Sequence, residues 1–250
     1  MLASSVEGTG PRLALLHGFT QDRRCWGPVA ADLATDHEVV RVDAPGHGGS
    51  SAVRADLAAG AELVVATVGR AAYLGYSMGG RLALHAALAA PEQVVALVLV
   101  GATGGLDDPG ERAARVAQDE QLARRLEDEG LEAFLDHWLS LPLFAGLDPE
   151  AGGLDARLGN TVDGLASSLR LAGTGSQEPL WDRLDGLTMP VLVIAGERDP
   201  KFRALGERLV DCIGANASLA IVPGAGHAAH LERPDDFLGI VRPWLGRHHR

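Results

Sequence analysis

The segment Gly75-Tyr76-Ser77-Met78-Gly79-Gly80 carries the strongest chemical signal in the sequence. It follows an apolar run and opens a helix-like stretch, which is the setting of a Gly-x-Ser-x-Gly turn between a strand and a helix. The flanking glycines let the backbone bend sharply without a clash and raise the hydroxyl above the sheet. The N-terminus of the helix beneath it favours developing negative charge. Ser77 is therefore the predicted catalytic serine.

Two later strand ends supply the partners that such a serine needs. Asp199 closes the run Ile194–Asp199 and His227 closes Pro223–His227, which gives the chain order Ser, Asp, His. We expect Asp199 to accept a hydrogen bond from one imidazole nitrogen of His227. The other nitrogen is then free to take the Ser77 proton.

Three other residues compete for these two roles. Glu197 comes too early at its strand end, and Asp211 falls inside a helical segment. His230 begins the helix after the predicted catalytic histidine, and we expect it to pack at the mouth of the pocket. None of the three is predicted to be catalytic.

A second loop is predicted to complete the site. Leu16-His17-Gly18-Phe19 ends the first clear strand, and in this arrangement such a loop and the residue after the serine each supply a backbone amide to an oxyanion hole. The predicted donors are the N–H groups of Phe19 and Met78. We expect His17 to brace the loop by hydrogen bonding. The glycine-rich segment Asp43–Ser50 is interpreted as structural.

The surrounding sequence alternates short apolar runs with helix-like segments. The runs lack polar alternation, as expected for strands buried on both faces of a parallel sheet. The predicted strands are Arg12–Leu16, Glu38–Val42, Ala71–Leu74, Val94–Val100, Pro190–Ala195 and Ser218–Val222. The predicted helices are Val29–Ala34, Ala52–Val68, Gly79–Ala90, Phe202–Ile213 and Asp235–Leu245. The pattern predicts a doubly wound α/β sheet, mostly parallel and with helices on both faces. Together with the serine turn and the chain order Ser, Asp, His, it indicates the α/β-hydrolase fold.

The alternation stops between residues 104 and 184. This stretch is charged and helical, with predicted helices over Glu111–Glu129, Leu131–Leu139, Pro149–Asn160 and Val162–Leu171. Ligands of such sheets bind outside the carboxyl ends of the strands, so we expect a helical cap there. The predicted organisation is a core over residues 1–103, a cap over 104–184 and the rest of the core over 185–250.

Composition narrows the class of partner. The chain has 250 residues, of which 46% are hydrophobic and 22% charged, and its formal net charge is −11. This charge argues against nucleic acid and acidic membrane surfaces as partners. No export signal or membrane-spanning run is visible, and the two cysteines have no metal-binding or disulfide spacing. We expect a cytoplasmic protein, with nothing demanding more than a monomer and no metal site.

Arg81 lies four residues after Ser77, on the same face of the predicted helix. An ordinary esterase has little use for a cation there, whereas an enzyme that binds a carboxylate beside its serine does. The alternative is a structural ion pair between Arg81 and the cap.

Several segments together resemble one family, the 2-succinyl-6-hydroxy-2,4-cyclohexadiene-1-carboxylate synthases of menaquinone biosynthesis. These segments are Gly75–Arg81, Gly105-Leu106 with Glu111–Arg115, Phe134–Trp138 with Pro142–Phe144, Gly196–Leu205 and Gly226–Glu232. The resemblance implies a lyase that eliminates pyruvate from an enolpyruvyl cyclohexene, without cofactor or metal. It also implies that the serine, backed by His227 and Asp199, removes a ring proton.

The resemblance further implies which residues bind the acidic small-molecule substrate. Its carboxylates would pair with guanidinium groups, which both orient them and favour their charge in a dry pocket. The positions that match the family's substrate-binding and pocket-lining residues are Arg81, Arg115, Arg157, Tyr76, Trp138 and Lys201. Two other functions stay open: a carboxylesterase or carbon–carbon bond hydrolase acting on an acidic small molecule, and a noncatalytic binding protein.

Overall fold

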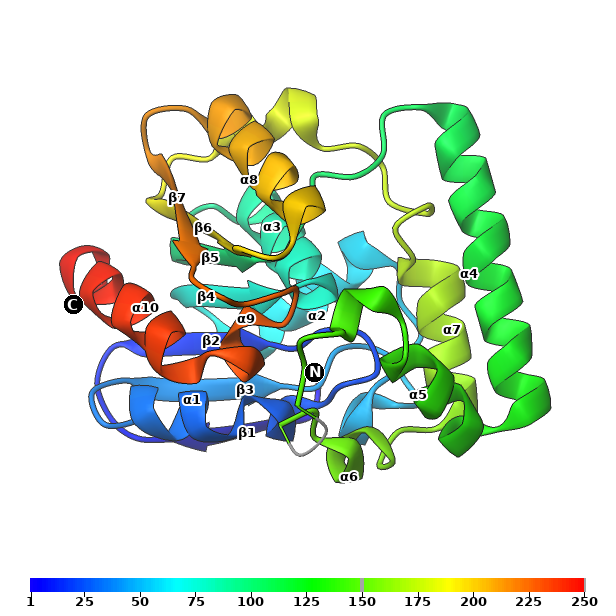
Figure 1. Ribbon diagram of the computed structural model, residues 1–250. Coiled ribbons are helices and arrows are strands. Elements are labelled where there is room, and N and C mark those ends of the chain that lie inside the picture. The colour runs from blue at the N-terminus through cyan, green and yellow to red at the C-terminus, as the bar shows by residue number, and fades with distance from the viewer. Residues whose placement is uncertain (149–150, 250) are drawn as a thin grey trace.

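A seven-stranded sheet forms the centre of the protein (Figure 1). The computed structural model describes residues 1–148 and 151–249. The sheet order is β1-β3-β2-β4-β5-β6-β7, with β1 antiparallel to β3 and the other neighbours parallel. The strands are β1 (Ser4–Glu7), β2 (Arg12–Leu16), β3 (Glu38–Val42), β4 (Ala71–Tyr76), β5 (Val94–Val100), β6 (Val191–Gly196) and β7 (Ala217–Val222). The predicted fold class is confirmed.

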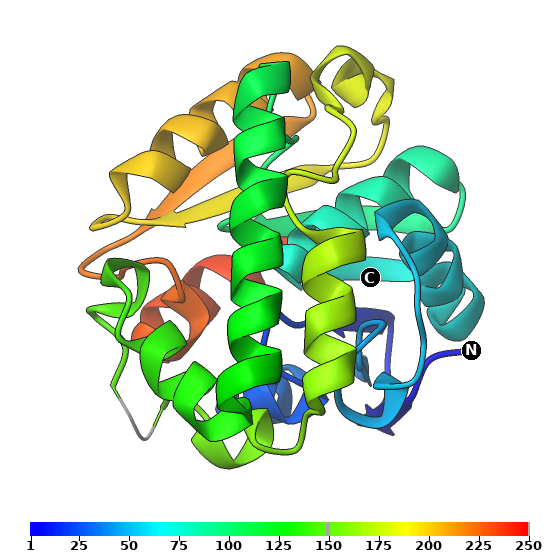
Figure 2. The ribbon, with the colours of Figure 1, turned by 90° about the vertical axis from the view of Figure 1, so that its right-hand side faces the viewer.

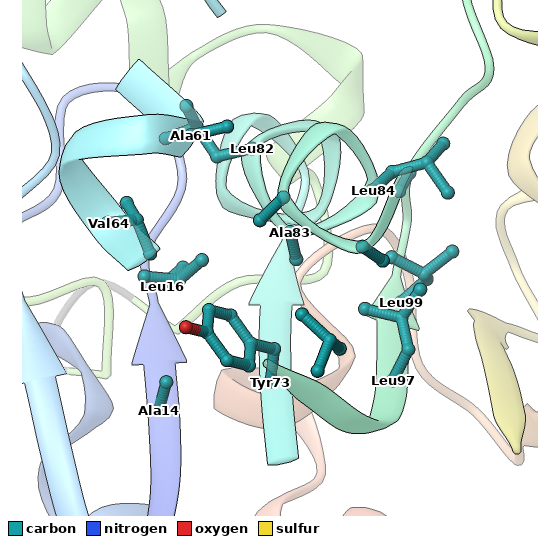
Figure 3. Packing of buried hydrophobic residues seen from close by; sticks show 14 of the residues in the cluster. Ala14, Leu16, Ala61, Val64, Tyr73, Leu82, Ala83, Leu84, Leu97 and Leu99 are labelled. Atoms are coloured by element: carbon teal, nitrogen blue, oxygen red, sulfur yellow. The ribbon is translucent and has the colours of Figure 1, made fainter. Parts of the chain in front are cut away.

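Helices cover both faces of the sheet, which explains why the central strands are apolar throughout. On one face lie α1 (Gly27–Leu33) and α10 (Pro234–His248), and on the other α2 (Leu57–Val68), α3 (Met78–Ala89) and α8 (Pro200–Ile213). Figure 3 shows the second face, where the Tyr73 ring of β4 points toward Leu16 of β2 and Leu82 of α3 lies beside Ala61 of α2. Each face therefore has its own apolar core, and the strands between them are fixed from both sides.

Between β5 and β6 the chain forms helices that lie together at one end of the sheet (Figure 1). They are α4 (Pro109–Glu129), α5 (Leu131–Leu139), α6 (Leu154–Arg157) and α7 (Val162–Ala172). Figure 2 shows α4 and α7 side by side along this end. A third apolar cluster, which includes Leu126, Phe134 and Leu165, holds these helices together.

Short helical turns complete the connections. They are η1 (Arg23–Trp26), η2 (Gly48–Ser50), η3 (Pro142–Phe144), η4 (Trp181–Gly186) and α9 (Ala229–Glu232). Within residues 1–148 and 151–249, no helix is both long enough and apolar enough to cross a membrane.

Two predicted helices had wrong bounds, and one strand was not predicted. The helix predicted from Ala52 begins only at Leu57, because the Asp56 side chain accepts a hydrogen bond from the Ala59 N–H and caps it there. The sequence also gave no sign of β1, a short and largely exposed edge strand. Of the helix predicted over Pro149–Asn160, residues 149 and 150 lie outside the described residues, and the rest forms only the short α6. Gly153 precedes α6 with a φ of 66°, which prevents a continuous helix.

Candidate active site

Ser77 lies on a sharp turn between β4 and α3. Its φ of 52° and ψ of −111° are unusual for a residue with a side chain, so the surrounding backbone must hold it there. The Ser77 N–H donates to the Val100 carbonyl at 2.8 Å. A Cβ at Gly75 would lie 2.3 Å from the Gly79 oxygen, and one at Gly79 would lie 2.1 Å from the Leu16 oxygen. Both flanking glycines are therefore required by the close approach of backbone.

His227 and Asp199 meet Ser77 in the predicted order. The His227 Nε2 lies 3.2 Å from the Ser77 Oγ, and its Nδ1 lies 2.9 Å from the Asp199 Oδ2. The other Asp199 oxygen accepts from the Phe202 N–H at 3.1 Å and so caps α8. An ionised carboxylate only accepts, so the proton of the neutral imidazole lies on Nδ1 and Nε2 can accept from the serine hydroxyl.

The competing acids lie elsewhere. Glu197 is exposed and accepts from the Gly224 N–H at 2.8 Å, and Asp211 lies within α8. Neither lines the cavity beside Ser77.

We expected His230 at the mouth of the pocket, but the structure places it in the core beneath the pocket. It is 1% exposed, and its ring centroid lies 4.5 Å from those of both Trp26 and Tyr76. Burial lowers its pKa to about 3. The helix that it was predicted to begin is only the short α9, which turns the side chain inward onto the core.

Hydrogen bonds hold the loop after β2, which contains the Phe19 amide. The His17 Nε2 accepts from the Ala44 N–H at 3.0 Å, so its Nδ1 carries the proton and donates to the Gly18 carbonyl at 2.8 Å. The Gln21 N–H donates to the same carbonyl at 3.2 Å. Because a trans peptide is planar, the Phe19 N–H points away from this carbonyl. His17 thus makes the bracing hydrogen bonds that the sequence led us to expect.

A second amide comes from Met78, the first residue of α3. An N–H in the first turn of a helix has no carbonyl one turn earlier to bind. Phe19 and Met78 both line the cavity that contains Ser77. Two residues from different elements therefore carry backbone amides into the lining of the cavity that contains Ser77, and a pair of this kind can serve as an oxyanion hole.

The cavity above Ser77 lies between the sheet and the helices that follow β5. It has about 880 Å³ of space between atoms, the open mouth included. Of the residues predicted for the site, it brings together all but Asp199, which lies behind the histidine. These lining residues are Phe19, Tyr76, Ser77, Met78, Arg81, Arg115, Trp138, Arg157, Lys201 and His227.

Arg81 is 7% exposed and points at the helices over the cavity. Its guanidinium donates to the Ala172 carbonyl at 2.8 Å and lies 3.5 Å from the Gln177 Oε1. Burial, and then the positive charge of Arg115, lower its pKa to about 10. It forms no salt bridge with any described residue, so the alternative of a structural ion pair receives no support. The contact with the cap is a hydrogen bond to neutral groups.

The two other arginines differ in their surroundings. Arg115 donates to the Asp119 carboxylate at 2.9 Å, and burial raises the pKa of that acid. Arg157 is 1% exposed, donates to the Gly152 carbonyl at 2.7 Å and also hydrogen-bonds the Thr20 hydroxyl. Burial lowers its pKa. Both guanidiniums reach the cavity from the segment between β5 and β6.

Lys201 is exposed at the cavity rim, with its ammonium 5.7 Å from the centre of the Phe202 ring. Aromatic rings form the rest of the wall. Trp138 lies 5.2 Å from Phe19, and Phe202 lies 4.3 Å from His227, centroid to centroid. The site is thus a largely apolar cavity with a net excess of positive side chains, which suits a ligand with several carboxylates.

Two residues with evident roles were missed. Glu232 accepts from the N–H groups on either side of His227, at 2.6 Å from Gly226 and 3.1 Å from Ala228. Asp119, 2% exposed, lines the cavity between two arginines. The signal for Glu232 was present, because it ends the segment Gly226–Glu232 on which the family resemblance was based. In residues 1–148 and 151–249, no three His, Cys, Asp or Glu side chains cluster as they would around a metal ion.

Known proteins resemble this chain in both sequence and structure. The model of the "Alpha/beta hydrolase family" matches residues 13–240. The chain is 36% identical to a putative 2-succinyl-6-hydroxy-2,4-cyclohexadiene-1-carboxylate synthase from Bacillus subtilis, over 96% of this chain and 94% of the relative. It is 35% identical to the 2-succinyl-6-hydroxy-2,4-cyclohexadiene-1-carboxylate synthase from Escherichia coli O1:K1, over 90% of this chain and 89% of the relative.

A solved structure, MenH from S. aureus, superposes with a TM-score of 0.92 and 28% identity, over 99% of both chains. A thermophilic esterase from Thermogutta terrifontis also shares the fold, with a TM-score of 0.86 at 24% identity. The sequence relatives extend over nearly the whole chain, including the helices after β5. The chain therefore belongs to the α/β-hydrolase family and, within it, to the 2-succinyl-6-hydroxy-2,4-cyclohexadiene-1-carboxylate synthases.

Proposed function

We propose that this protein is a 2-succinyl-6-hydroxy-2,4-cyclohexadiene-1-carboxylate synthase of menaquinone biosynthesis. It would act on 2-succinyl-5-enolpyruvyl-6-hydroxy-3-cyclohexene-1-carboxylate and release pyruvate. The observation that carries the proposal is the cavity itself, which is lined by Ser77 and His227 together with three arginines, Arg81, Arg115 and Arg157. A serine with its base supports proton abstraction, and the arginines support a substrate with several carboxylates.

The proposed reaction follows from the change in the ring. The 3-ene becomes a 2,4-diene, so a proton leaves C2, the double bond shifts and the C5–O bond breaks. The enolate of pyruvate leaves and takes up one proton to give pyruvate. Ser77 would first pass its hydroxyl proton to the His227 Nε2, which lies 3.2 Å away. The Ser77 oxygen would then abstract the C2 proton. C2 carries the ketone of the succinyl group, and the amides of Phe19 and Met78 would stabilise its enolate oxygen.

The arginines would hold the substrate carboxylates. Charge-assisted hydrogen bonds from guanidinium groups are roughly twice as strong as neutral ones, and the low polarity of the cavity strengthens them further. Arg81 is the closest of them in sequence to Ser77 and shares its helix. We propose that Arg81, Arg115 and Arg157 bind carboxylates, that Tyr76 and Trp138 pack on the ring, and that Lys201 attracts the substrate at the rim.

The segment from residue 104 to 184 is proposed to act as a cap over the core formed by 1–103 and 185–250. Its helices α4 to α7 contribute Arg115, Trp138 and Arg157 to the cavity. We propose a monomer as the working form. A polyanionic substrate does not diffuse across a bilayer, and a cytoplasmic location is proposed for this reason.

The experiment is a direct assay with purified protein. Pyruvate release from the enolpyruvyl cyclohexene is measured beside hydrolysis of p-nitrophenyl acetate, for the natural chain and for Ser77→Ala. We expect fast pyruvate release, weak ester cleavage and loss of pyruvate release by at least 10³-fold in the variant, on the scale of other serine active sites. Ester cleavage without pyruvate release would instead favour a carboxylesterase. Pyruvate release that survives in Ser77→Ala would exclude serine as the base.

A further inference from the structure

Thr20 has a backbone conformation that its residue type rarely adopts. Its φ is 67°, and Ser77 at 52° is the other non-glycine residue with positive φ among the described residues. A β-branched residue at such a φ is held there at a cost of about 1–3 kcal/mol. Thr20 directly follows Phe19, and Ser77 directly precedes Met78. The two strained residues therefore adjoin the two amides proposed for the oxyanion hole.

The strain at Thr20 belongs to a tight turn. The Gln21 N–H donates to the Gly18 carbonyl at 3.2 Å, which closes a β-turn over Gly18–Gln21 with Thr20 in the third position. Positive φ at that position is typical of a type II turn, where glycine or asparagine usually stands. A Thr20 that relaxed to negative φ would rotate the peptide planes of the turn and displace the Phe19 amide.

The side chain of Asn160, 140 positions further along the sequence, holds this turn. The Asn160 Nδ2 donates to the Thr20 carbonyl at 2.7 Å and to the Arg157 carbonyl at 3.0 Å, and its Oδ1 accepts from the Gly48 N–H at 2.8 Å. Both its donors and its acceptor oxygen are thus used. The carbonyls can only accept and the amide can only donate, so the orientation of the carboxamide is fixed. Asn160 is 6% exposed.

We propose that Asn160 is a positioning residue for the oxyanion hole. It joins the segment after α6 to the turn and keeps Thr20 in the conformation that aims the Phe19 amide at the reacting oxygen. Asn160 does not line the cavity, so it does not touch the substrate and acts through Thr20. The inference rests on the proposed function in taking the Phe19 amide as an oxyanion donor.

The first test replaces Asn160. Asn160→Ala removes every contact, and the near-isosteric Asn160→Asp keeps an acceptor for Gly48 but cannot donate to Thr20. A displaced donor costs less than a deleted one, so we expect kcat to fall roughly 10- to 100-fold in both variants, with KM changed less than threefold. Thr161→Ala is the matched control. It removes the N-cap of α7 one residue further on without touching the turn, and kcat should stay within about threefold of the natural chain.

A second-site change tests the cause. Glycine adopts positive φ freely, so Thr20→Gly keeps the turn without help from Asn160. In the Thr20→Gly background, Asn160→Ala should lower kcat at least about fivefold less than it does in the natural chain. A purely structural role for Asn160 would not be relieved in this way.

The outcomes separate clearly. The proposal is overturned if kcat of folded Asn160→Ala and Asn160→Asp stays within twofold of the natural chain, if Thr161→Ala loses as much, or if Thr20→Gly brings no relief. Should Asn160→Ala fail to fold, Asn160→Asp alone decides. All variants are also scored on p-nitrophenyl acetate, because ester hydrolysis uses the same oxyanion hole. A natural chain that cleaves the ester but releases no pyruvate would refute the proposed function and leave the positioning role testable.

Discussion

At the scale of single residues, Arg81 combines deep burial with neutral partners. Its guanidinium meets the Ala172 carbonyl and Gln177, and no acid pairs with it among the described residues. A buried charge whose hydrogen-bond partners are neutral is costly, and burial with the positive charge of Arg115 lowers the pKa of Arg81 to about 10, although the nearby Asp119 carboxylate, which pairs with Arg115, offsets part of this shift. A substrate carboxylate would add negative charge beside Arg81, which shares the single Asp119 carboxylate with Arg115. Arg81 is therefore the residue at which we expect a substrate carboxylate to bind.

Arg81→Met tests this interpretation. The change keeps the length of the side chain and removes its charge, so kcat/KM for pyruvate release should fall by about 1.5–3 kcal/mol of transition-state stabilisation, roughly 10- to 150-fold. Arg81→Lys keeps the charge but not the planar guanidinium, so its kcat/KM should lie between those of the natural chain and Arg81→Met.

The matched control for Arg81 is Arg170→Met. Arg170 lies on α7 outside the cavity and pairs with Glu120 and Glu127 at the surface. Exposed ion pairs contribute about 0–1 kcal/mol, so this variant should keep kcat/KM within about twofold. If Arg81→Met and Arg170→Met had equal kinetics, Arg81 would be a structural residue.

At the scale of elements, the loop after β7 illustrates how backbone contacts fix a side chain. Glu232 of α9 accepts from Gly226 and Ala228, and these two N–H groups flank His227. Fixing the peptide on both sides limits the directions in which the imidazole can point. Asp199 fixes it from the other direction through Nδ1. The orientation of the histidine is therefore set by one side-chain contact and two backbone contacts.

Glu232→Gln is expected to weaken this arrangement. Glutamine has one acceptor oxygen, so its NH₂ would face one of the two N–H donors. The unfolding free energy should fall by about 1–3 kcal/mol, and kcat should fall roughly tenfold through a less well-oriented base. Urea denaturation and steady-state pyruvate release measure the two effects.

The control for Glu232 is Glu197→Gln. Glu197 accepts from the Gly224 N–H in the same loop but does not contact the residues beside His227. Its variant should keep kcat within about twofold, since an exposed acceptor can be replaced by water. A Glu232→Gln enzyme with unchanged kcat would show that the loop holds its shape without this carboxylate.

The elements that could be predicted from the sequence share one property: each is determined by residues within its own segment. Apolar runs identified β2 to β7, and the glycines around Ser77 identified the turn. Features with distant causes were not predicted. The contact between Asn160 and Thr20 joins residues 140 positions apart, and β1 depends on its pairing with β3. Such contacts form only when the chain is folded, because the sequence around one partner does not indicate which distant residue it will contact.

At the scale of the whole molecule, three buried histidines link stability to pH. His17, His47 and His230 are at most 1% exposed, and burial lowers the pKa of all three, to about 3 for His47 and His230. The pKa of His230 in the unfolded chain is near 6.5, so the unfolded chain binds the proton first as the pH falls. Stability is therefore complete above about pH 6.5 and declines toward pH 3.

His230→Phe should reduce this decline. Phenylalanine keeps a ring between Trp26 and Tyr76 but takes no proton. For a pKa that changes from 6.5 to about 3, the loss of unfolding free energy between pH 7 and pH 5 is about 2 kcal/mol, and the variant should lose that much less than the natural chain. Urea denaturation at the two pH values measures the difference. His248→Phe, at an exposed position of α10, should leave the decline unchanged. If His230→Phe lost stability as steeply as the natural chain, proton binding at His230 would not govern the acid sensitivity, and His17 and His47 would be the next histidines to replace.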